Sequence, residues 1–450
     1  MAQESGRLNR RSMLKSAGVA AAVGLAGCGG GGDGGDGGDG GDTGGDTGGD
    51  GGDTGGDTGG GTPSEQGPSD RSEPYLNELP DYYPESYWRT IDGAMDESEQ
   101  TIYTAYFGAM AESTVEAFNE RFDFIDWNIT TLGTAEVYSR FTTEASRGQV
   151  NPDVLFTYDP IAMRQLFTAG LLEERVSPEV SEAPDGTWPE RTLTDIDGLI
   201  QNHHSWGGHT WSPRLYDDAG LDEPPMGHTL EWYTDHIEDN SDFYQNNTAQ
   251  YDGITSTSGW QQMDFYAAAF GEDWMVDQYE TMASTNPRSF WSTSTMGGWV
   301  GNGEVAYAMG MAQWIVAAFI AQDFDVGSEV QWGTHVMHNI MHPAWQSVEG
   351  ASNPHSGRLF ADWTRSQHGN AAIADLWNLG PARTDIDDDE LSLYHPDFDA
   401  TTNLSSIQES DNFSMLDEGS EDSILMPFEN RTTRTSQKSK YKDMWYNMFS

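Results

Sequence analysis

Apolar residues in the central part of the chain alternate between two spacings. Residues 101–106 form a run of β-branched and aromatic side chains, which predicts a strand. Val115, Phe118 and Phe122 then recur at helical spacing, so we expect a helix over residues 111–122.

The same strand-then-helix pattern repeats twice more. It predicts strands over 126–132 and 152–157 and helices over 134–147 and 160–169. This order of elements indicates a parallel sheet that is covered by helices on both faces.

Polar residues at the carboxyl ends of these strands are candidates for binding. Ligands of open α/β sheets bind at the carboxyl ends of the strands. Tyr106 follows the first predicted strand, and Tyr158 and Asp159 follow the third.

A second group of elements follows after a weakly patterned stretch. We expect a strand near Tyr251 that leads into a helix over 261–270, and then a strand over 303–310. Further helices are expected over 313–321, 357–366 and 371–376, and short helices near 441–448.

The turn before the helix at 261–270 is made of small hydroxyl residues. It reads Thr255-Ser256-Thr257-Ser258-Gly259. Backbone amides at a helix N-terminus, with hydroxyls beside them, form an anion site. An ordinary helix N-cap also favours serine and threonine, so both interpretations stay open.

The N-terminal part of the chain has the organisation of an export signal. Asn9-Arg10-Arg11-Ser12-Met13-Leu14-Lys15 resembles a twin-arginine signal, and a short apolar segment follows. Leu25-Ala26-Gly27-Cys28 resembles the lipobox of lipoproteins, in which the cysteine is lipidated, and Cys28 is the single cysteine of the chain. The alternative is an unprocessed N-terminal anchor or a run of alanine and glycine without a signal function.

Residues 29–61 consist almost entirely of glycine, aspartate and threonine. Such a segment has no apolar surface to bury, so we expect a disordered tether. Residues 62–98 are rich in proline, tyrosine and acidic residues, and we expect an irregular lead-in on the surface of the domain.

The charge of the chain is strongly negative. Its 450 residues include 22 lysines and arginines against 73 acidic residues, for a formal net charge of −51. Such a chain repels itself at ordinary ionic strength, whereas molar salt shortens the Debye length to about 3 Å. Acidic excess with only four lysines is typical of a halophilic surface. The 52 aromatic residues argue against general disorder, and the absence of a basic patch argues against nucleic-acid binding.

Catalytic motifs are weak in this sequence. There is no Gly-x-Ser-x-Gly motif, and a lipidated Cys28 leaves no free thiol. Two histidine groups could bind a metal, although polar loop histidines are the favoured interpretation. The groups are His203, His204 and His209, and His335, His338 and His342.

The order and spacing of several segments resemble the iron(III)-type branch of the periplasmic solute-binding proteins of ABC transporters. The segments that carry the resemblance are Thr101–Phe122, Phe141–Leu172, Thr255–Gly259, Asn302–Ala306, Gly350-Ala351 and Pro381–Arg383. The resemblance covers roughly residues 100–385 and implies a two-lobed α/β fold. Each lobe would hold a mixed, mostly parallel sheet flanked by helices, and crossing hinge strands would join the lobes.

The resemblance also implies a ligand held between the lobes. Iron-binding members carry adjacent tyrosines where this chain has Gln313 and Trp314, and an acidic residue where it has Tyr158. This departure favours an organic or phosphorylated anion, while Tyr158, Asp159 and Tyr307 could still form an iron(III) site. The implied ligand-binding set is Tyr106, Tyr158, Asp159, Ser256, Thr257, Ser258, Gln313 and Trp314.

The function implied is that of the substrate-binding component of an ABC importer, a haloarchaeal-type lipoprotein on the outer face of the cytoplasmic membrane. It would deliver a small solute or metal ion to a permease and its ATPase, as a monomer without cofactor or catalysis. A secreted, lipid-anchored hydrolase is the alternative.

The expected units are a signal over 1–27, lipidated Cys28 and tether over 28–61, a lead-in over 62–98, a first lobe over 99–205 and 334–385, a second lobe over 206–333, and an acidic C-terminal segment over 386–450.

Overall fold

A computed structural model describes most of the chain from residue 67 onward. The described residues are 67–105, 108–188, 196–224, 230–290, 292–312, 319, 326–330, 338–343, 345–377, 379–386, 392–393, 402–403 and 435–449. The predicted signal, Cys28, the tether, Tyr106, His335, Gln313 and Trp314 lie outside this part, as does nearly all of the helix predicted over 313–321.

The first lobe is built on a four-stranded sheet of order β10-β3-β1-β2. Its strands are β1 (Glu99–Thr104), β2 (Asp126–Thr131), β3 (Val154–Phe156) and β10 (Gln346–Ser347). Strand β1 is parallel to both β2 and β3, and β10 is antiparallel to β3. The helices of this lobe are α2 (Glu73–Leu76), η2 (Glu85–Tyr87), α3 (Trp88–Glu97), α4 (Gly108–Asn119), α5 (Thr134–Ser146), α6 (Pro160–Thr168), α7 (Pro178–Ser181), α15 (Pro354–Arg365) and α16 (Gln367–Trp377).

The three predicted strand–helix units are confirmed within about three residues at each end. Val115 and Phe118 of α4 are buried, as their helical spacing predicts, and they pack in the core of this lobe with Phe122 and Phe360. The periodicity of buried positions therefore determines this half of the fold.

The second lobe holds a sheet of order β11-β4-β7-β5-β6, in which β8 and β9 also pair with β4. Its strands are β4 (Gln201–Trp211), β5 (Thr248–Tyr251), β6 (Arg288–Phe290), β7 (Tyr307–Ala312), β8 (Gly327–Val330), β9 (His338–Pro343) and β11 (Gly380–Pro381). Strand β5 is parallel to both β6 and β7. The helices are α8 (Pro213–Ala219), α9 (Leu230–Asp239), α10 (Ser241–Tyr244), α11 (Thr257–Phe270), α12 (Glu272–Ser284) and α13 (Thr293–Gly301).

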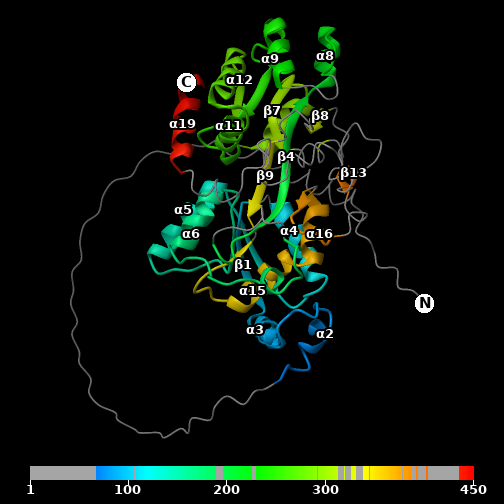
Figure 1. Cartoon of the computed structure of the whole chain (residues 1–450), viewed down its shortest axis with the longest axis vertical. Helices are drawn as coiled ribbons and strands as arrows, with labels where there is room; N and C mark the ends of the chain where they lie inside the picture. The colour runs from blue at the N-terminus through cyan, green and yellow to red at the C-terminus, as the bar shows by residue number, and fades with distance from the viewer. Residues whose placement is uncertain are drawn as a thin grey trace, which may run out of the picture.

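Two long antiparallel strands connect the lobes. Strand β4 pairs with β9 from Gln201 to Gly207, and with β8 from Gly208 to Trp211. In Figure 1, β4 and β9 run side by side from the upper part of the molecule into the lower part. This arrangement is the crossing-strand connection that the fold class predicts.

The lead-in at 62–98 differs from the prediction of an irregular surface segment. Residues 88–97 form helix α3, which packs against α15. Tyr87, Ile91 and Ala94 are 4 %, 0 % and 0 % exposed and belong to the core of the first lobe. Ile91 and Ala94 lie three positions apart on one face of α3, and Tyr87 caps the start of the helix, so burial of that face stabilises α3.

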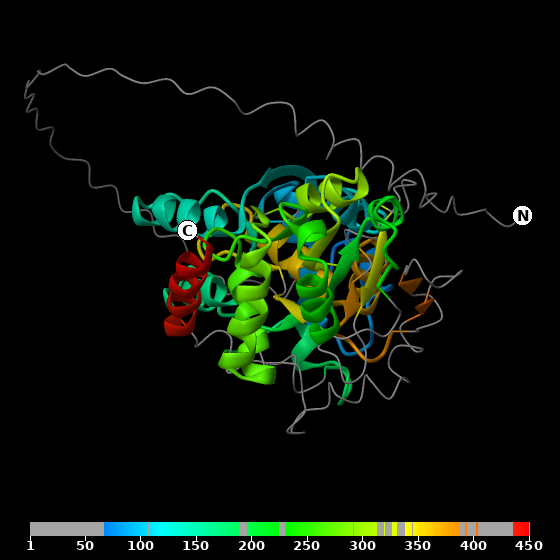
Figure 2. The same cartoon turned by 90° about the horizontal axis from the view of Figure 1, so that it is seen from above.

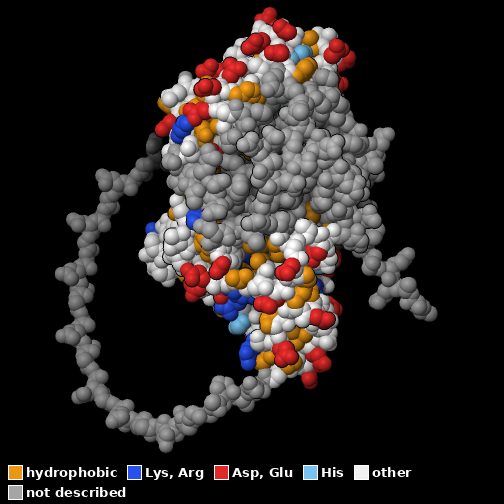
Figure 3. Space-filling view, in the orientation of Figure 1, with side chains coloured by type: hydrophobic (Ala, Val, Ile, Leu, Met, Phe, Trp, Pro, Cys, Tyr) orange, Lys and Arg blue, Asp and Glu red, His pale blue; other side chains and the backbone are white. Residues whose placement is uncertain are grey.

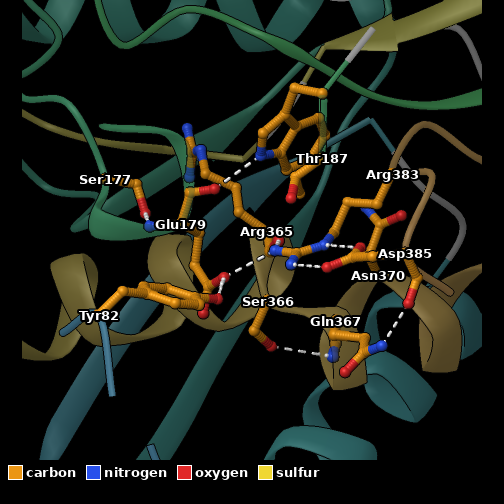
Figure 4. A network of polar contacts seen from close by, with 12 residues as sticks. Tyr82, Ser177, Glu179, Thr187, Arg365, Ser366, Gln367, Asn370, Arg383 and Asp385 are labelled. Carbon is orange, nitrogen blue, oxygen red and sulfur yellow. Dashed lines mark hydrogen bonds and ion pairs between the residues drawn. The ribbon is translucent and has the colours of Figure 1, made fainter. Parts of the chain in front are cut away.

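A buried polar network ties distant segments of the first lobe together (Figure 4). The guanidinium of Arg383 donates to Glu179 at 2.6 Å and to both carboxylate oxygens of Asp385 at 2.8 and 2.6 Å. Tyr82 of the lead-in donates to the same Glu179 at 2.6 Å. The Arg383 and Glu179 side chains are at most 1 % exposed, so this ion pair is shielded from solvent.

The histidines predicted to lie in loops are on strands instead. His203 and His209 are both on β4 and both 1 % exposed; their neighbours Asn202 and Thr210 are 0 % exposed, so the strand is buried on both faces at these positions. His338 and His342 lie on β9. Among the described residues, no group of three histidine, cysteine or acidic side chains could hold a metal ion.

A C-terminal helix, α19 (Thr435–Phe449), confirms the helix predicted near 441–448. It lies along α11 and α12 of the second lobe (Figures 1 and 2). The short strands β12 (Ser392–Leu393) and β13 (Thr402–Asn403) pair with each other. Within the described part of the chain, no helix has the length and apolar character needed to cross a membrane.

Acidic side chains form several patches on the face of the molecule that Figure 3 shows. In Figure 3, aspartates and glutamates gather over the far end of the second lobe and again over the lower lobe, where some lysines and arginines lie beside them. The distribution matches the net charge of the sequence and places the repulsion at the surface of both lobes.

Candidate functional site

The first side of the candidate site lies at the carboxyl end of β3, where Asp159 caps helix α6. Asp159 Oδ1 accepts hydrogen bonds from the backbone N–H groups of Ile161 and Ala162 at 3.0 and 3.2 Å. Pro160 occupies the first helical turn, where its missing N–H costs nothing. The predicted residue Asp159 is therefore fixed in place and is only 4 % exposed.

Tyr158, the second predicted residue on this side, is half-buried. Its ring packs edge-on against Phe156 at a centroid distance of 5.0 Å. The preceding Thr157 donates its hydroxyl to the carbonyl of Thr134 at 3.0 Å, which joins the end of β3 to the start of α5. Tyr158 and Asp159 thus stand together at the carboxyl edge of the first sheet.

The opposite side is formed by the hydroxyl-rich turn after β5. Asp252 Oδ1 accepts from the N–H groups of Ile254 and Thr255 at 2.7 and 3.0 Å, which closes the turn. Ser256 then caps α11, because its Oγ accepts from the N–H of Gly259 at 3.3 Å. The cap interpretation is confirmed for Ser256, whereas Thr257 and Ser258 belong to the first turn of the helix.

A second hydroxyl-rich helix start lies beside the first and was not predicted. Ser292 caps α13 by accepting from the N–H of Thr295 at 3.4 Å. Thr293 and the buried Tyr251 share a hydrogen bond of 2.5 Å between their hydroxyl groups. Because β5 and β6 are parallel neighbours, α11 and α13 begin at the same edge of the sheet. The sequence run from Ser292 to Thr295 repeats the pattern of the first turn and could have revealed it.

Spare polar groups occur close to this edge. The side-chain amide of Gln261 on α11 is buried, and neither its nitrogen nor its oxygen has a hydrogen-bond partner in the described part of the chain. The indole N–H of the neighbouring Trp260 is also buried and has no hydrogen-bond partner in the described part of the chain. Burying such groups without partners costs roughly 1–3 kcal/mol each, so a bound solute that pairs with them would recover that energy.

Tyr307, which was a candidate ligand only for the case of iron(III), lies in the aromatic core of the second lobe. It pairs with Thr248 at the start of β5, so it stands at the end of the sheet opposite the hydroxyl turns. Its hydroxyl is hydrogen-bonded to Nδ1 of His209, and its ring stacks on Tyr233 with centroids 4.2 Å apart. Burial raises the pKa of Tyr307 well above its ordinary value, so the phenolate that iron(III) prefers is disfavoured here. The structure does not bring Tyr307 to Tyr158 and Asp159.

Lys438 on α19 joins the candidate site and was missed by the sequence reasoning. Its ammonium lies 2.6 Å from Oδ2 of Asp159 and 5.4 Å from the ring centre of Trp260. The scarcity of lysine in the sequence could have pointed to it, because the three lysines outside the N-terminal segment are Lys438, Lys440 and Lys442. All three lie within five residues on one helix.

Comparison with solved structures shows the fold. The chain is similar to a substrate-binding protein of an ABC transporter from Agrobacterium tumefaciens, with a TM-score of 0.63 at 15% identity, over 79% of this chain and 97% of that one. It is also similar to the periplasmic binding protein AfuA from Actinobacillus pleuropneumoniae with fructose-6-phosphate bound (TM-score 0.61, 15% identity, 78% and 98% covered). Iron-bound HitA from Pseudomonas aeruginosa is a third (TM-score 0.57, 15% identity, 78% and 99% covered).

These comparisons establish the two-lobed periplasmic-binding-protein fold for this chain. No protein-family model matches the sequence, and no curated protein matches it either.

Proposed function

We propose that this chain is the extracytoplasmic substrate-binding component of an ABC importer. The observation that carries the proposal is the pair of polar strand ends. Tyr158 and Asp159 lie at the carboxyl edge of one sheet, and Ser256, Thr257 and Ser258 lie at the carboxyl edge of the other. Binding between two lobes of this kind operates by hinge closure on the solute.

For the ligand, we propose a phosphorylated or other organic anion. The N-termini of α11 and α13 present backbone amides and hydroxyls at one edge, which is the chemistry that binds phosphate groups. The buried amide of Gln261 adds a neutral donor and acceptor on the same helix. Tyr106, Gln313 and Trp314, which follow β1 and β7 in sequence, complete the proposed set.

Iron(III) is the second candidate ligand because one structural neighbour, HitA, is iron-bound. The described residues favour it less. Tyr307 is held in the core, and Asp159 already receives two N–H groups and an ammonium on its two oxygens.

We further propose that the protein is exported through its twin-arginine signal, lipidated at Cys28 and held at the outer face of the membrane by the tether. There the monomer would hand its solute to a permease and its ATPase. We also propose that residues 99–205 and 334–385 form the first lobe, that residues 206–333 form the second lobe, and that the protein is of haloarchaeal type. In this proposal the protein binds and releases its solute without covalent chemistry. A lipid-anchored hydrolase is the competing function.

Isothermal titration in molar KCl tests the proposed site. Fructose 6-phosphate, inorganic phosphate and iron(III) citrate are titrated into the wild type and into Tyr158→Phe, Ser258→Ala and Tyr307→Phe variants. We expect the first two variants to bind the preferred solute at least tenfold more weakly, because each loses a hydrogen bond to a buried ligand. Tyr307→Phe is the control and should keep the wild-type affinity. Equal affinities in all four proteins would contradict the site assignment.

A further inference from the structure

Helix α19 is anchored on the second lobe by aromatic side chains. Tyr441 and Trp445 are 2 % and 7 % exposed and belong to the hydrophobic core of that lobe. The indole of Trp445 lies directly on Gly253, where an added Cβ would come within 2.4 Å of the ring. Gly253 follows Asp252 in the turn that leads to the hydroxyl residues, so the helix is fastened beside the candidate site.

From this anchor, α19 extends a cation to the other lobe. Lys438 pairs with Asp159 of the first lobe, and its side chain is 27 % exposed in this pair, against 6 % for Asp159. Ile161, in the first turn of α6, belongs to the same hydrophobic cluster as Tyr441. The contact between the lobes at this point is therefore apolar as well as ionic.

Lys442 is a second cation of the same helix, one turn away from Lys438. Burial and the neighbouring ammonium of Lys438 lower the pKa of Lys442, while the carboxylates of Asp159 and Asp252 act in the opposite direction. Because residues four positions apart share a face of a helix, Lys442 lies on the same side of α19 as Lys438. Lys440, by contrast, points to Glu272 at the start of α12, within the second lobe.

Helix α19 changes the charge at this edge, because Lys438 places an ammonium on Asp159. Without it, the two strand ends present the carboxylates of Asp159 and Asp252 and would attract cations, as the rest of this acidic chain does. With it, Lys438 and Lys442 supply two ammonium groups to the same place. The remaining polar groups at the edge are the amides and hydroxyls of α11 and α13, which favour anions.

We infer that Lys438, supported by Lys442, determines the specificity of the site by serving as the built-in counter-ion of Asp159, which reserves the site for anionic solutes and closes it to cationic ones. This inference rests on the proposed function and assigns it a ligand class. Helix α19 would then be part of the binding site, although it is far from the two sheets in sequence.

A charge-removal variant tests the inference. The double variant Lys438→Gln/Lys442→Gln is compared with the wild type and with Lys440→Gln, which removes a charge from the same helix at an ion pair within the second lobe. Titration in molar KCl uses fructose 6-phosphate and inorganic phosphate as anions, and spermidine as the cation. Near-ultraviolet circular dichroism confirms that α19 remains packed in each protein.

We expect the double variant to bind the anionic solute at least tenfold more weakly than the wild type and to gain measurable binding of spermidine. Lys440→Gln should stay within twofold of the wild type for every solute. If the wild type binds none of the solutes, the proposed function fails for them, but a gain of cation binding in the double variant still supports the role of Lys438. The inference is overturned if the double variant gains no cation binding. It is also overturned if Lys440→Gln gains as much cation binding as the double variant.

Discussion

Lys438 Nζ and Asp159 Oδ2 lie 2.6 Å apart, although the two residues are separated by 279 positions in the sequence. The pair joins the C-terminal helix on the second lobe to the helix α6 of the first. A double-mutant cycle with Lys438→Gln and Asp159→Asn should give a coupling energy of about 1–2 kcal/mol, because the pair is partly shielded from water. Asparagine retains the oxygen that caps α6.

The control for this cycle is the pair Lys440–Glu272, whose side chains are 41% and 44% exposed. Its coupling energy should stay under roughly 0.5 kcal/mol, because water and salt screen it. Urea unfolding in molar KCl measures both cycles. Equal coupling energies in the two pairs would show that the contact between Lys438 and Asp159 stabilises the protein no more than an exposed ion pair does.

Gly253 allows the indole of Trp445 to lie on the backbone. We predict that Gly253→Ala lowers the free energy of unfolding by about 1–3 kcal/mol, because the added methyl group would overlap the ring and displace α19. Gly298→Ala in α13 is the matched control, since a Cβ there meets no atom within 4 Å. It should raise stability by roughly 0.5–1 kcal/mol through its helix propensity. A loss of stability in both variants would contradict the packing argument.

The buried ion pair between Arg383 and Glu179 is predicted to be sensitive to loss of one partner (Figure 4). Arg383→Ala should cost roughly 3–5 kcal/mol, because it leaves the carboxylate of Glu179 buried without its cation. Thermal unfolding in molar KCl measures the effect. Arg71→Ala breaks an exposed pair with Asp96 and should leave the melting temperature unchanged. A small effect of Arg383→Ala would show that the network tolerates the missing charge.

His203 gives the fold a predicted dependence on pH. Burial lowers the pKa of His203 from 6.5 to about 4, and its Nε2 is hydrogen-bonded to the carbonyl of Asn370 at 3.0 Å. In the unfolded chain the imidazole takes up a proton below about pH 6.5, whereas in the folded chain it does so only near pH 4. Stability should therefore fall as the pH is lowered through this window, by about 3 kcal/mol from this residue.

Urea unfolding at several pH values between 7 and 4 measures that slope. His203→Gln removes the titrating group but keeps a side chain that can donate a hydrogen bond. The variant should show a slope smaller by up to about one proton in this window. If the slope of the variant equals that of the wild type, His203 is not buried in its neutral form.

The first lobe was largely predictable because its strands and helices bury regular faces. Val115, Phe118 and Phe122 indicate a helix from spacing alone, and the structure buries all three. Helix α3 was missed because acidic residues and prolines surround its short buried face at Ile91 and Ala94. Its stability comes from packing against α15, which sequence spacing does not report.

The candidate site was predictable only in part. Ser256 was placed correctly at a helix start, since a run of hydroxyl residues before an apolar helix is a local signal. The pairing of Asp159 with Lys438 could not be predicted, because any of the acidic residues could have paired with Lys438. Only the tertiary fold brings α6 and α19 together.

Melting curves in molar KCl test whether this chain captures a solute between its lobes. The protein is heated alone and with fructose 6-phosphate, inorganic phosphate, iron(III) citrate or spermidine. A bound solute at a hundred times its dissociation constant stabilises the folded state by about 2.7 kcal/mol, so we expect a clear rise in Tm with a phosphorylated anion. Unchanged melting with every solute, together with turnover of a hydrolase substrate, would contradict the proposed function.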